Sequence, residues 1–111
     1  MSTVTRWWWI RHAPVPSGRN IVYGQMDLDA DCSDSAAFDG LARALPKGAV
    51  LVTSDLKRTI QTADAIRAAG LDLPQPFVDP ELREQHFGDW QGMTHEAFGA
   101  LREATSHRHW R

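Results

Sequence analysis

Short apolar runs alternate along the chain with amphipathic stretches, in the order strand, helix, strand, helix, strand, helix. The first run, Val4–Ile10, carries bulky side chains at both odd and even positions, so we expect a central strand that is buried on both faces. Ala49–Thr53 is a second apolar run without polar alternation and is predicted as a strand, and Pro74–Asp79 is predicted as a short third strand. Prolines place the last of them near a sheet edge.

Three stretches have helical periodicity. The first is expected after a cap at Ser33 or Ser35. The second spans Asp55–Arg67 and is expected to stop at Gly70, and the third begins at Thr94. Because strands and helices alternate, the sequence predicts an α/β domain with three layers: a mainly parallel sheet and helices on both of its faces.

Composition narrows the class of protein. The 111 residues suffice for one small domain, residues 1–111, and the net charge of -2 does not indicate a nucleic-acid partner. The single cysteine, Cys32, excludes an intramolecular disulfide and is typical of a reducing compartment. No apolar run approaches the ~20 residues of a membrane helix, and no signal-peptide pattern is present. We therefore expect a cytoplasmic protein without a membrane partner.

Side chains that suit an anion follow the first two predicted strands. Arg11 and His12 end the first strand, and Arg58 lies in the first turn of the helix after the second. The carboxyl ends of parallel strands share one rim, where ligands bind, and a helix N-terminus attracts anions. We expect the two arginines to grip a phosphoryl group, while neighbouring cations keep the attacking His12 neutral. The alternative is that these residues are ordinary polar ends of a strand and a helix.

Three motifs resemble those of the histidine phosphatase (phosphoglycerate mutase-like) superfamily. They are the Arg11-His12 pair after an apolar run, the segment Thr53–Ala63 at the start of a helix, and the segment Leu82–Gly92. An Arg-His pair alone is a weak motif, but three motifs in this order and at compatible spacing are specific. The resemblance covers residues 4 to about 98 and implies a phosphoglycerate mutase-like fold.

The resemblance also implies roles for individual residues. His12 matches the histidine that is phosphorylated during turnover, and Arg11 and Arg58 match the phosphate-binding arginines. Glu84 matches the glutamate that protonates the leaving group or activates the incoming water. This chemistry needs no cofactor, and no metal-binding motif is evident in the sequence.

Glu84 is chemically suited to that role if its pKa is raised. A carboxyl group can protonate a leaving alkoxide when partial burial favours its neutral form. The neighbouring Phe87 and Trp90 are expected to supply such surroundings. The alternative is a surface carboxylate that pairs with Arg83.

The sequence departs from the family pattern in three places. It has no second histidine in a His-Gly context, so it is expected to be either the N-terminal part of a longer domain or a short form. Ala13-Pro14 replaces the commoner Gly-Glu or Gly-Gln, a version that resembles some small-molecule phosphatase branches. The loop asparagine of many members has no direct match, which leaves Arg19, Asn20 and Gln25 as candidates for the substrate loop.

The leading hypothesis is hydrolysis of a phosphorylated small molecule through a phosphohistidine intermediate. One alternative is phosphoglycerate mutase-type phosphoryl transfer between hydroxyls of one substrate. Another is a catalytically impaired phosphate-binding module, because loss of one charge-stabilising donor typically costs roughly 10²–10³ in rate. A homodimer is a further expectation, since a sheet without its later strands has an open edge.

Overall fold

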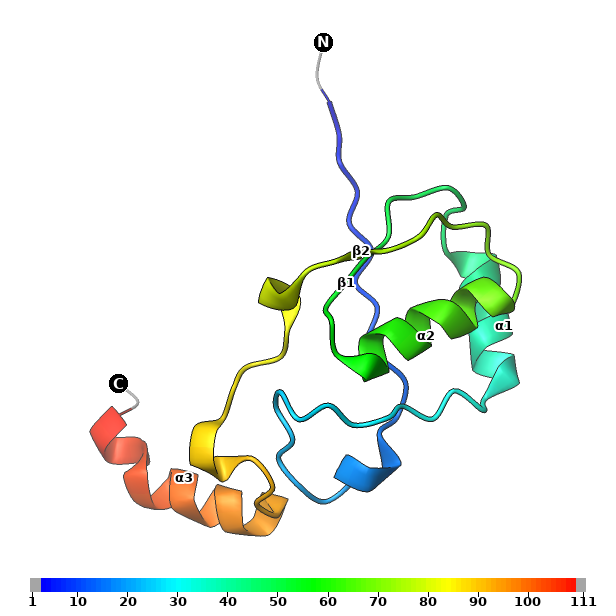
Figure 1. Cartoon of the computed structure of the whole chain (residues 1–111). Helices are drawn as coiled ribbons and strands as arrows, with labels where there is room; N and C mark the ends of the chain where they lie inside the picture. The colour runs from blue at the N-terminus through cyan, green and yellow to red at the C-terminus, as the bar shows by residue number, and fades with distance from the viewer. Residues whose placement is uncertain (1–2, 110–111) are drawn as a thin grey trace.

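The computed structural model describes residues 3–109, and Figure 1 shows the arrangement of its elements. The described part contains three α-helices and a sheet of two strands. In chain order these are α1 (Ser35–Ala44), β1 (Val52–Thr53), α2 (Lys57–Ala68), β2 (Phe77–Val78) and α3 (His95–His109). Three single-turn 3₁₀ helices accompany them at Pro16–Gly18, Pro80–Leu82 and Gly88–Trp90.

Strands β1 and β2 pair in parallel and are joined through α2. Val52 lies opposite Phe77, and Thr53 lies opposite Val78. The amide of Asp79 donates to the carbonyl of Thr53 at 2.8 Å, so the pairing continues just past the end of β2. The predicted α/β class with parallel strands is confirmed, although both strands are shorter than the apolar runs that predicted them.

The prediction of a buried first strand is wrong for this structure. Residues 4–10 run as an elongated segment that belongs to no strand, and Figure 1 shows this segment leading to the N-terminus. Trp7 and Trp9 stack on each other with ring centroids 5.9 Å apart, as alternate residues of an extended chain can. They are 71 % and 82 % exposed, respectively. An apolar run becomes a buried strand only when neighbouring strands and helices cover it, and the described residues do not cover this one.

Capping chemistry explains where the helices begin and end. Asp34, not the predicted Ser33 or Ser35, caps α1, because its carboxylate accepts a hydrogen bond from the amide of Ala37. Gly70, with φ +113°, follows the end of α2 as predicted. The predicted cap at Thr94 is also confirmed, since its hydroxyl accepts from the amide of Ala97 at 3.1 Å.

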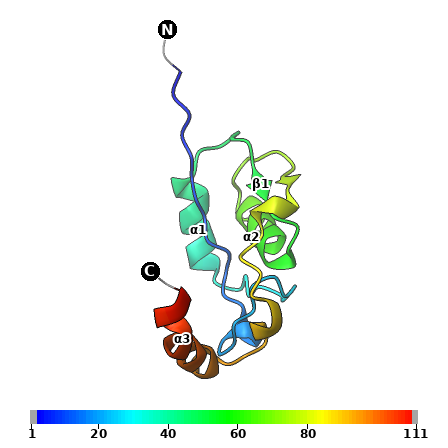
Figure 2. The same cartoon turned by 90° about the vertical axis from the view of Figure 1, so that its left-hand side faces the viewer.

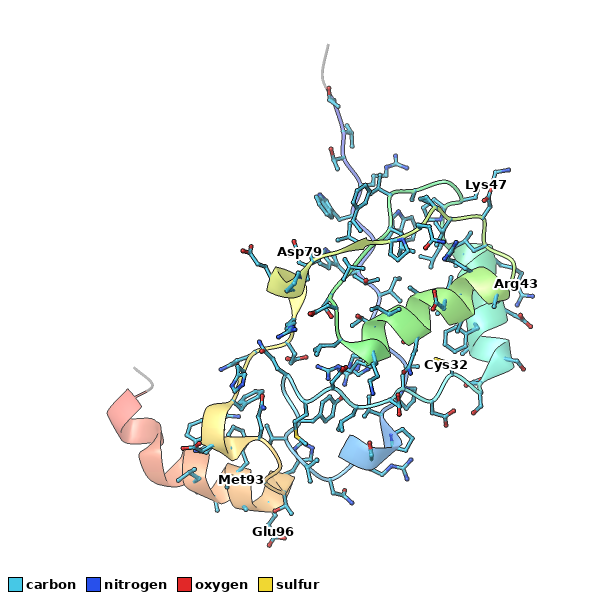
Figure 3. The ribbon with its side chains drawn as sticks, viewed as in Figure 1. Cys32, Arg43, Lys47, Asp79, Met93 and Glu96 are labelled. Atoms are coloured by element: carbon cyan, nitrogen blue, oxygen red, sulfur yellow. The ribbon has the colours of Figure 1, made fainter. Side chains whose placement is uncertain are left out.

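The core lies mainly between α1 and α2. Its buried members are Ala13, Phe38, Ile66 and Leu71, which come from the chain after His12, from both helices and from the turn after α2. Cys32 packs against this cluster, and Figure 3 shows it beside the two helices. Burial raises the pKa of the Cys32 thiol.

A loop comprising residues 13–31 connects this core to the part of the chain that contains α3. On one side it bonds to α2, where Gln61 accepts from the amide of Ala30. On the other side Val22 exchanges backbone hydrogen bonds with Gly92 and Met93. In both Figure 1 and Figure 2, α3 lies at the opposite end of the molecule from the elongated N-terminal segment.

The resulting shape is flat and open. The radius of gyration is 17.1 Å, whereas a compact domain of this length has about 13 Å. Large apolar side chains are exposed on the N-terminal segment, just before β1 and on both strands; they are Val4, Trp7, Trp8, Trp9, Ile10, Val50, Val52, Phe77 and Val78. No helix among the described residues is long and apolar enough to cross a membrane.

Candidate active site

Two cavities meet where the N-terminal segment enters the 13–31 loop. The larger has a volume of about 700 Å³ and the smaller about 390 Å³. Arg11, His12 and Glu84 line both of them. Arg58 and Ser54 line the smaller one. The structure therefore brings together the four residues that the sequence analysis selected for catalysis and phosphate binding.

His12 is half-buried and held in a defined orientation. Its Nδ1 lies 2.7 Å from the carbonyl oxygen of Ala13. Because a carbonyl can only accept, this nitrogen carries the proton, and in the neutral ring the lone pair is on Nε2. Ala13 is itself held by Thr62, whose hydroxyl accepts from the Ala13 amide at 2.8 Å. The imidazole thus presents a nucleophilic nitrogen from a backbone that is fixed to α2.

Arg58 is almost completely buried, with 1 % of its surface exposed. Its two terminal amino groups donate to the carbonyl oxygens of Met26 at 2.9 Å and Gly24 at 2.6 Å. Among the described residues it forms no ion pair, and its Nε has no hydrogen-bond partner. A buried cation without a carboxylate is costly unless an anion compensates it. Arg58 therefore holds the loop and retains a positive charge that no carboxylate of the described residues neutralises.

The start of α2 differs from the expectation of a free helix N-terminus. Ser54 is 2 % exposed, and its hydroxyl accepts from the amide of Leu56 at 3.3 Å. The carboxylate of Asp27 accepts from the amide of Lys57 at 2.7 Å. These acceptors occupy the amides of Leu56, which precedes α2, and of Lys57, its first residue, so neither of these two amides is free for an anion.

The expected burial of Glu84 is wrong. Its side chain is exposed, because Phe87 and Trp90 pack instead on Phe98 of α3, at centroid distances of 5.6 and 5.3 Å. The backbone of Glu84 is fixed by Gln25, whose side-chain Nε2 donates to the Glu84 carbonyl at 3.0 Å. Glu84 therefore reaches the two cavities from a segment that the 13–31 loop positions.

Arg83 does not pair with Glu84. Its Nε donates to a carboxylate oxygen of Asp55 at 2.6 Å, and its terminal amino group bonds to the second oxygen. The hydrogen bonds from Arg83 lower the pKa of Asp55. This pair ties the segment before α2 to the segment that carries Glu84.

The three candidates for the substrate loop occupy different places. Arg19 lines the larger cavity. Asn20 accepts a hydrogen bond from the amide of His95 through its backbone carbonyl, and the Gln25 side chain holds the Glu84 segment. Neither Asn20 nor Gln25 lines either of the two cavities.

Among the residues of the larger cavity that sequence reasoning missed are Tyr23, His95 and Phe98. The last two come from α3, whose approach to His12 depends on the backbone pairing of residues 20–22 with 92–95. No local pattern predicts that pairing. Tyr23 is the single tyrosine of the chain and stands in a turn-rich loop, which was a usable indication.

Comparison with known proteins identifies the family of this chain. A model of the histidine phosphatase superfamily (branch 1) matches residues 7–111, and the chain belongs to that superfamily. Over 78 residues it is 45 % identical to the glucosyl-3-phosphoglycerate phosphatase of Mycolicibacterium vanbaalenii, which corresponds to 64 % of this chain and 32 % of that protein. It is 37 % identical over 81 residues to the enzyme of the same name from Mycobacterium tuberculosis, covering 68 % of this chain and 35 % of that protein.

Solved structures show the same fold. The TTHB049 protein of Thermus thermophilus aligns with a TM-score of 0.66 and 31 % identity, covering 89 % of this chain and 55 % of that one. The mycobacterial glucosyl-3-phosphoglycerate phosphatase Rv2419c aligns with a TM-score of 0.62 and 29 % identity, covering 84 % and 46 %. The chain thus spans about a third of the length of the curated relatives it matches and about half of these solved chains.

Proposed function

We propose that this protein takes part in phosphomonoester hydrolysis through a phosphohistidine formed on His12. The observation that carries the proposal is the shared lining of the two cavities by Arg11, His12 and Glu84, with the unpaired, buried Arg58 in the smaller one. A structure of the related mycobacterial phosphatase in complex with VO3 supports an anion pocket in this fold.

The chemistry follows from the positions of these groups. Nε2 of His12 attacks phosphorus, and the bond from phosphorus to the leaving oxygen breaks while the carboxyl group of Glu84 protonates that oxygen. Arg11 and Arg58 offset the charge on the phosphoryl oxygens. In the second half, the Glu84 carboxylate takes a proton from water, which attacks phosphorus and breaks the bond to Nε2.

Exposure of the site favours hydrolysis over transfer between two hydroxyls of one substrate. Transfer needs water to be kept from the phosphohistidine, but both Arg11 and Glu84 are exposed. Phosphate binding without turnover is the second candidate, because Arg58 is buried whereas Glu84, the expected proton donor, lacks the burial that suits this role. Titration with inorganic vanadate together with a phosphate-release assay distinguishes these functions.

The decisive experiment is to trap the intermediate. The chain is mixed with p-nitrophenyl phosphate and denatured in alkali, in which phosphohistidine survives, and the peptides are mapped by mass spectrometry. We expect one phosphoryl group on His12, none in His12→Asn, and an unchanged yield in His86→Asn. His86 is the matched control because it is exposed and lines neither cavity. Phosphorylation that persists at the same yield in His12→Asn would refute the proposal.

The volume and lining of the larger cavity favour a substrate whose organic part carries a carboxylate. Its volume exceeds what a phosphoryl group fills, and its lining includes the cation Arg19 as well as the apolar Phe87 and Phe98. The related mycobacterial enzymes are named for a phosphoglycerate derivative. We expect 3-phosphoglycerate to be hydrolysed faster than glycerol phosphate, and Arg19→Gln to remove most of that preference. An unchanged ratio of kcat/KM in Arg19→Gln would contradict this assignment.

A further inference from the structure

One aromatic ring touches both the nucleophile and the buried arginine. The Tyr23 ring lies beneath the guanidinium of Arg58, whose central carbon is 4.8 Å from the ring centroid. The imidazole of His12 meets the same ring edge-on, with centroids 6.3 Å apart and planes inclined by 66°. Tyr23 comes from the 13–31 loop, whereas Arg58 belongs to α2. The ring is thus the direct contact between groups from distant parts of the chain.

An aromatic partner leaves the charge of Arg58 available. A carboxylate in the same position would neutralise the guanidinium and compete with a phosphoryl group for its donors. The face of a tyrosine ring attracts a cation without adding net charge. The terminal amino groups of Arg58 bond to uncharged carbonyls of Gly24 and Met26, and its Nε is unpartnered. Every partner of Arg58 that the structure describes is therefore electrically neutral.

The position of the Tyr23 ring is itself constrained. A methyl group built on Gly18 would lie 2.5 Å from Cδ1 and 2.9 Å from Cε1 of the ring, so the ring packs directly against the backbone of Gly18. Gly18 is buried. The ring therefore has little room to swing away from Arg58 and His12.

We propose that Tyr23 is a positioning residue: its ring fixes the separation of Arg58 and His12 while leaving the charge of Arg58 unpaired for the phosphoryl group. The inference rests on the proposed function and adds a residue to it. The ring, not the hydroxyl, performs this role, because both contacts are made by the ring. Phenylalanine is therefore a competent replacement, and leucine, which is apolar but lacks a quadrupole and a rigid plane, is not.

The test compares Tyr23→Phe and Tyr23→Leu with the unchanged chain and with Phe77→Leu. Phe77 is an exposed aromatic residue on β2, outside both cavities, and makes the matched control. We expect Tyr23→Leu to slow phosphorylation of His12 by about ten- to a hundredfold per folded molecule, because small displacements of reacting groups have effects of this size. Tyr23→Phe is expected to remain within about threefold of the unchanged chain, as is Phe77→Leu.

Two further measurements do not depend on turnover. Inorganic vanadate is expected to bind Tyr23→Leu about tenfold more weakly, and the Nε proton of Arg58, observed by NMR, is expected to exchange faster with solvent. If Tyr23→Leu lowers only the folded fraction, and each folded molecule reacts normally, the positioning role is refuted. Equal losses in Tyr23→Phe and Tyr23→Leu would also overturn it, by assigning the effect to the hydroxyl.

Failure of the proposed function has a different outcome. In that case the unchanged chain forms no phosphohistidine. The vanadate affinity and the exchange rate of the Arg58 Nε proton can still be measured in Tyr23→Leu and Tyr23→Phe, and they test the positioning role without turnover. Equal vanadate affinity and equal exchange in the two variants then refute the positioning role as well.

Discussion

Replacement of Gly24 by alanine tests whether the 13–31 loop positions the groups that we propose for catalysis. Gly24 has φ +45°, and a methyl group at this position would lie 2.6 Å from Oε1 of Gln91 and 2.8 Å from the carbonyl oxygen of Gln85. Its own carbonyl accepts the 2.6 Å hydrogen bond from Arg58. Gly24→Ala therefore pushes the loop away from the segment that follows Glu84, at the point where the loop also holds Arg58.

The free energy of unfolding is expected to fall by two separate contributions. A left-handed backbone costs roughly 1–2 kcal/mol for a residue with a side chain. Overpacking against Gln85 and Gln91 adds about 1–3 kcal/mol, because one neighbour is backbone that cannot rotate away. The sum is a large part of the about 5–15 kcal/mol that stabilises a typical domain.

Gly48→Ala is the matched control for this change. Gly48 has φ +75°, but a methyl group there meets nothing within 4 Å, so only the backbone contribution remains. Urea denaturation of both variants isolates the steric contribution as their difference, which we expect to be about 1–3 kcal/mol. Phosphate release per folded molecule is expected to fall in Gly24→Ala only. Equal destabilisation by the two substitutions, with equal activity, would show that the close approach at Gly24 has no role.

Three further predictions concern other parts of the molecule. The hydrogen bonds from Arg83 lower the pKa of Asp55 from 3.8, so this pair stabilises the fold above pH 3.8 and ceases to do so as the pH falls through the pKa of the folded protein. Urea titrations at several pH values should show that the difference in free energy of unfolding between the unchanged chain and Asp55→Asn shrinks only below pH 3.8. Burial raises the pKa of Cys32, so iodoacetamide should alkylate it more slowly than a cysteine in a short peptide at pH 8, and a faster rate would contradict its packing. Trp9 is 82 % exposed in an apolar segment, so Trp9→Ser should reduce self-association in sedimentation at high concentration, and an unchanged profile would exclude this segment as a homodimer contact.

Local chemistry predicted much of the fold. The stop at Gly70 and the cap at Thr94 depend on a few neighbouring residues, and the periodicity of α2 depends on its own sequence. For the same reason the two segments that flank α2 were recognised as parallel strands. Asp34 was overlooked because serine and aspartate are nearly equivalent as caps, and composition alone does not choose between adjacent candidates.

Tertiary context decided the features that the sequence did not reveal. The tryptophans of residues 7–9 have the composition of a buried strand, but burial depends on neighbours that a local pattern does not specify. The exposure of Glu84 has the same origin, because Phe98 of α3 packs against the aromatic residues that were expected to cover the carboxylate. Tyr23 was overlooked because its importance derives from Arg58, 35 positions later in the sequence.

Residues 20–26 join the region of α1 and α2 to the region of α3, and this connection has a thermodynamic consequence. Arg58 holds this stretch from α2, and residues 92–95 pair with it from the α3 side, so an occupant of the two cavities touches both regions at once. A ligand that binds only while the regions are docked raises the free energy needed to separate them. Amide protons deep within α3 would then exchange more slowly at saturating vanadate, even at positions remote from the anion.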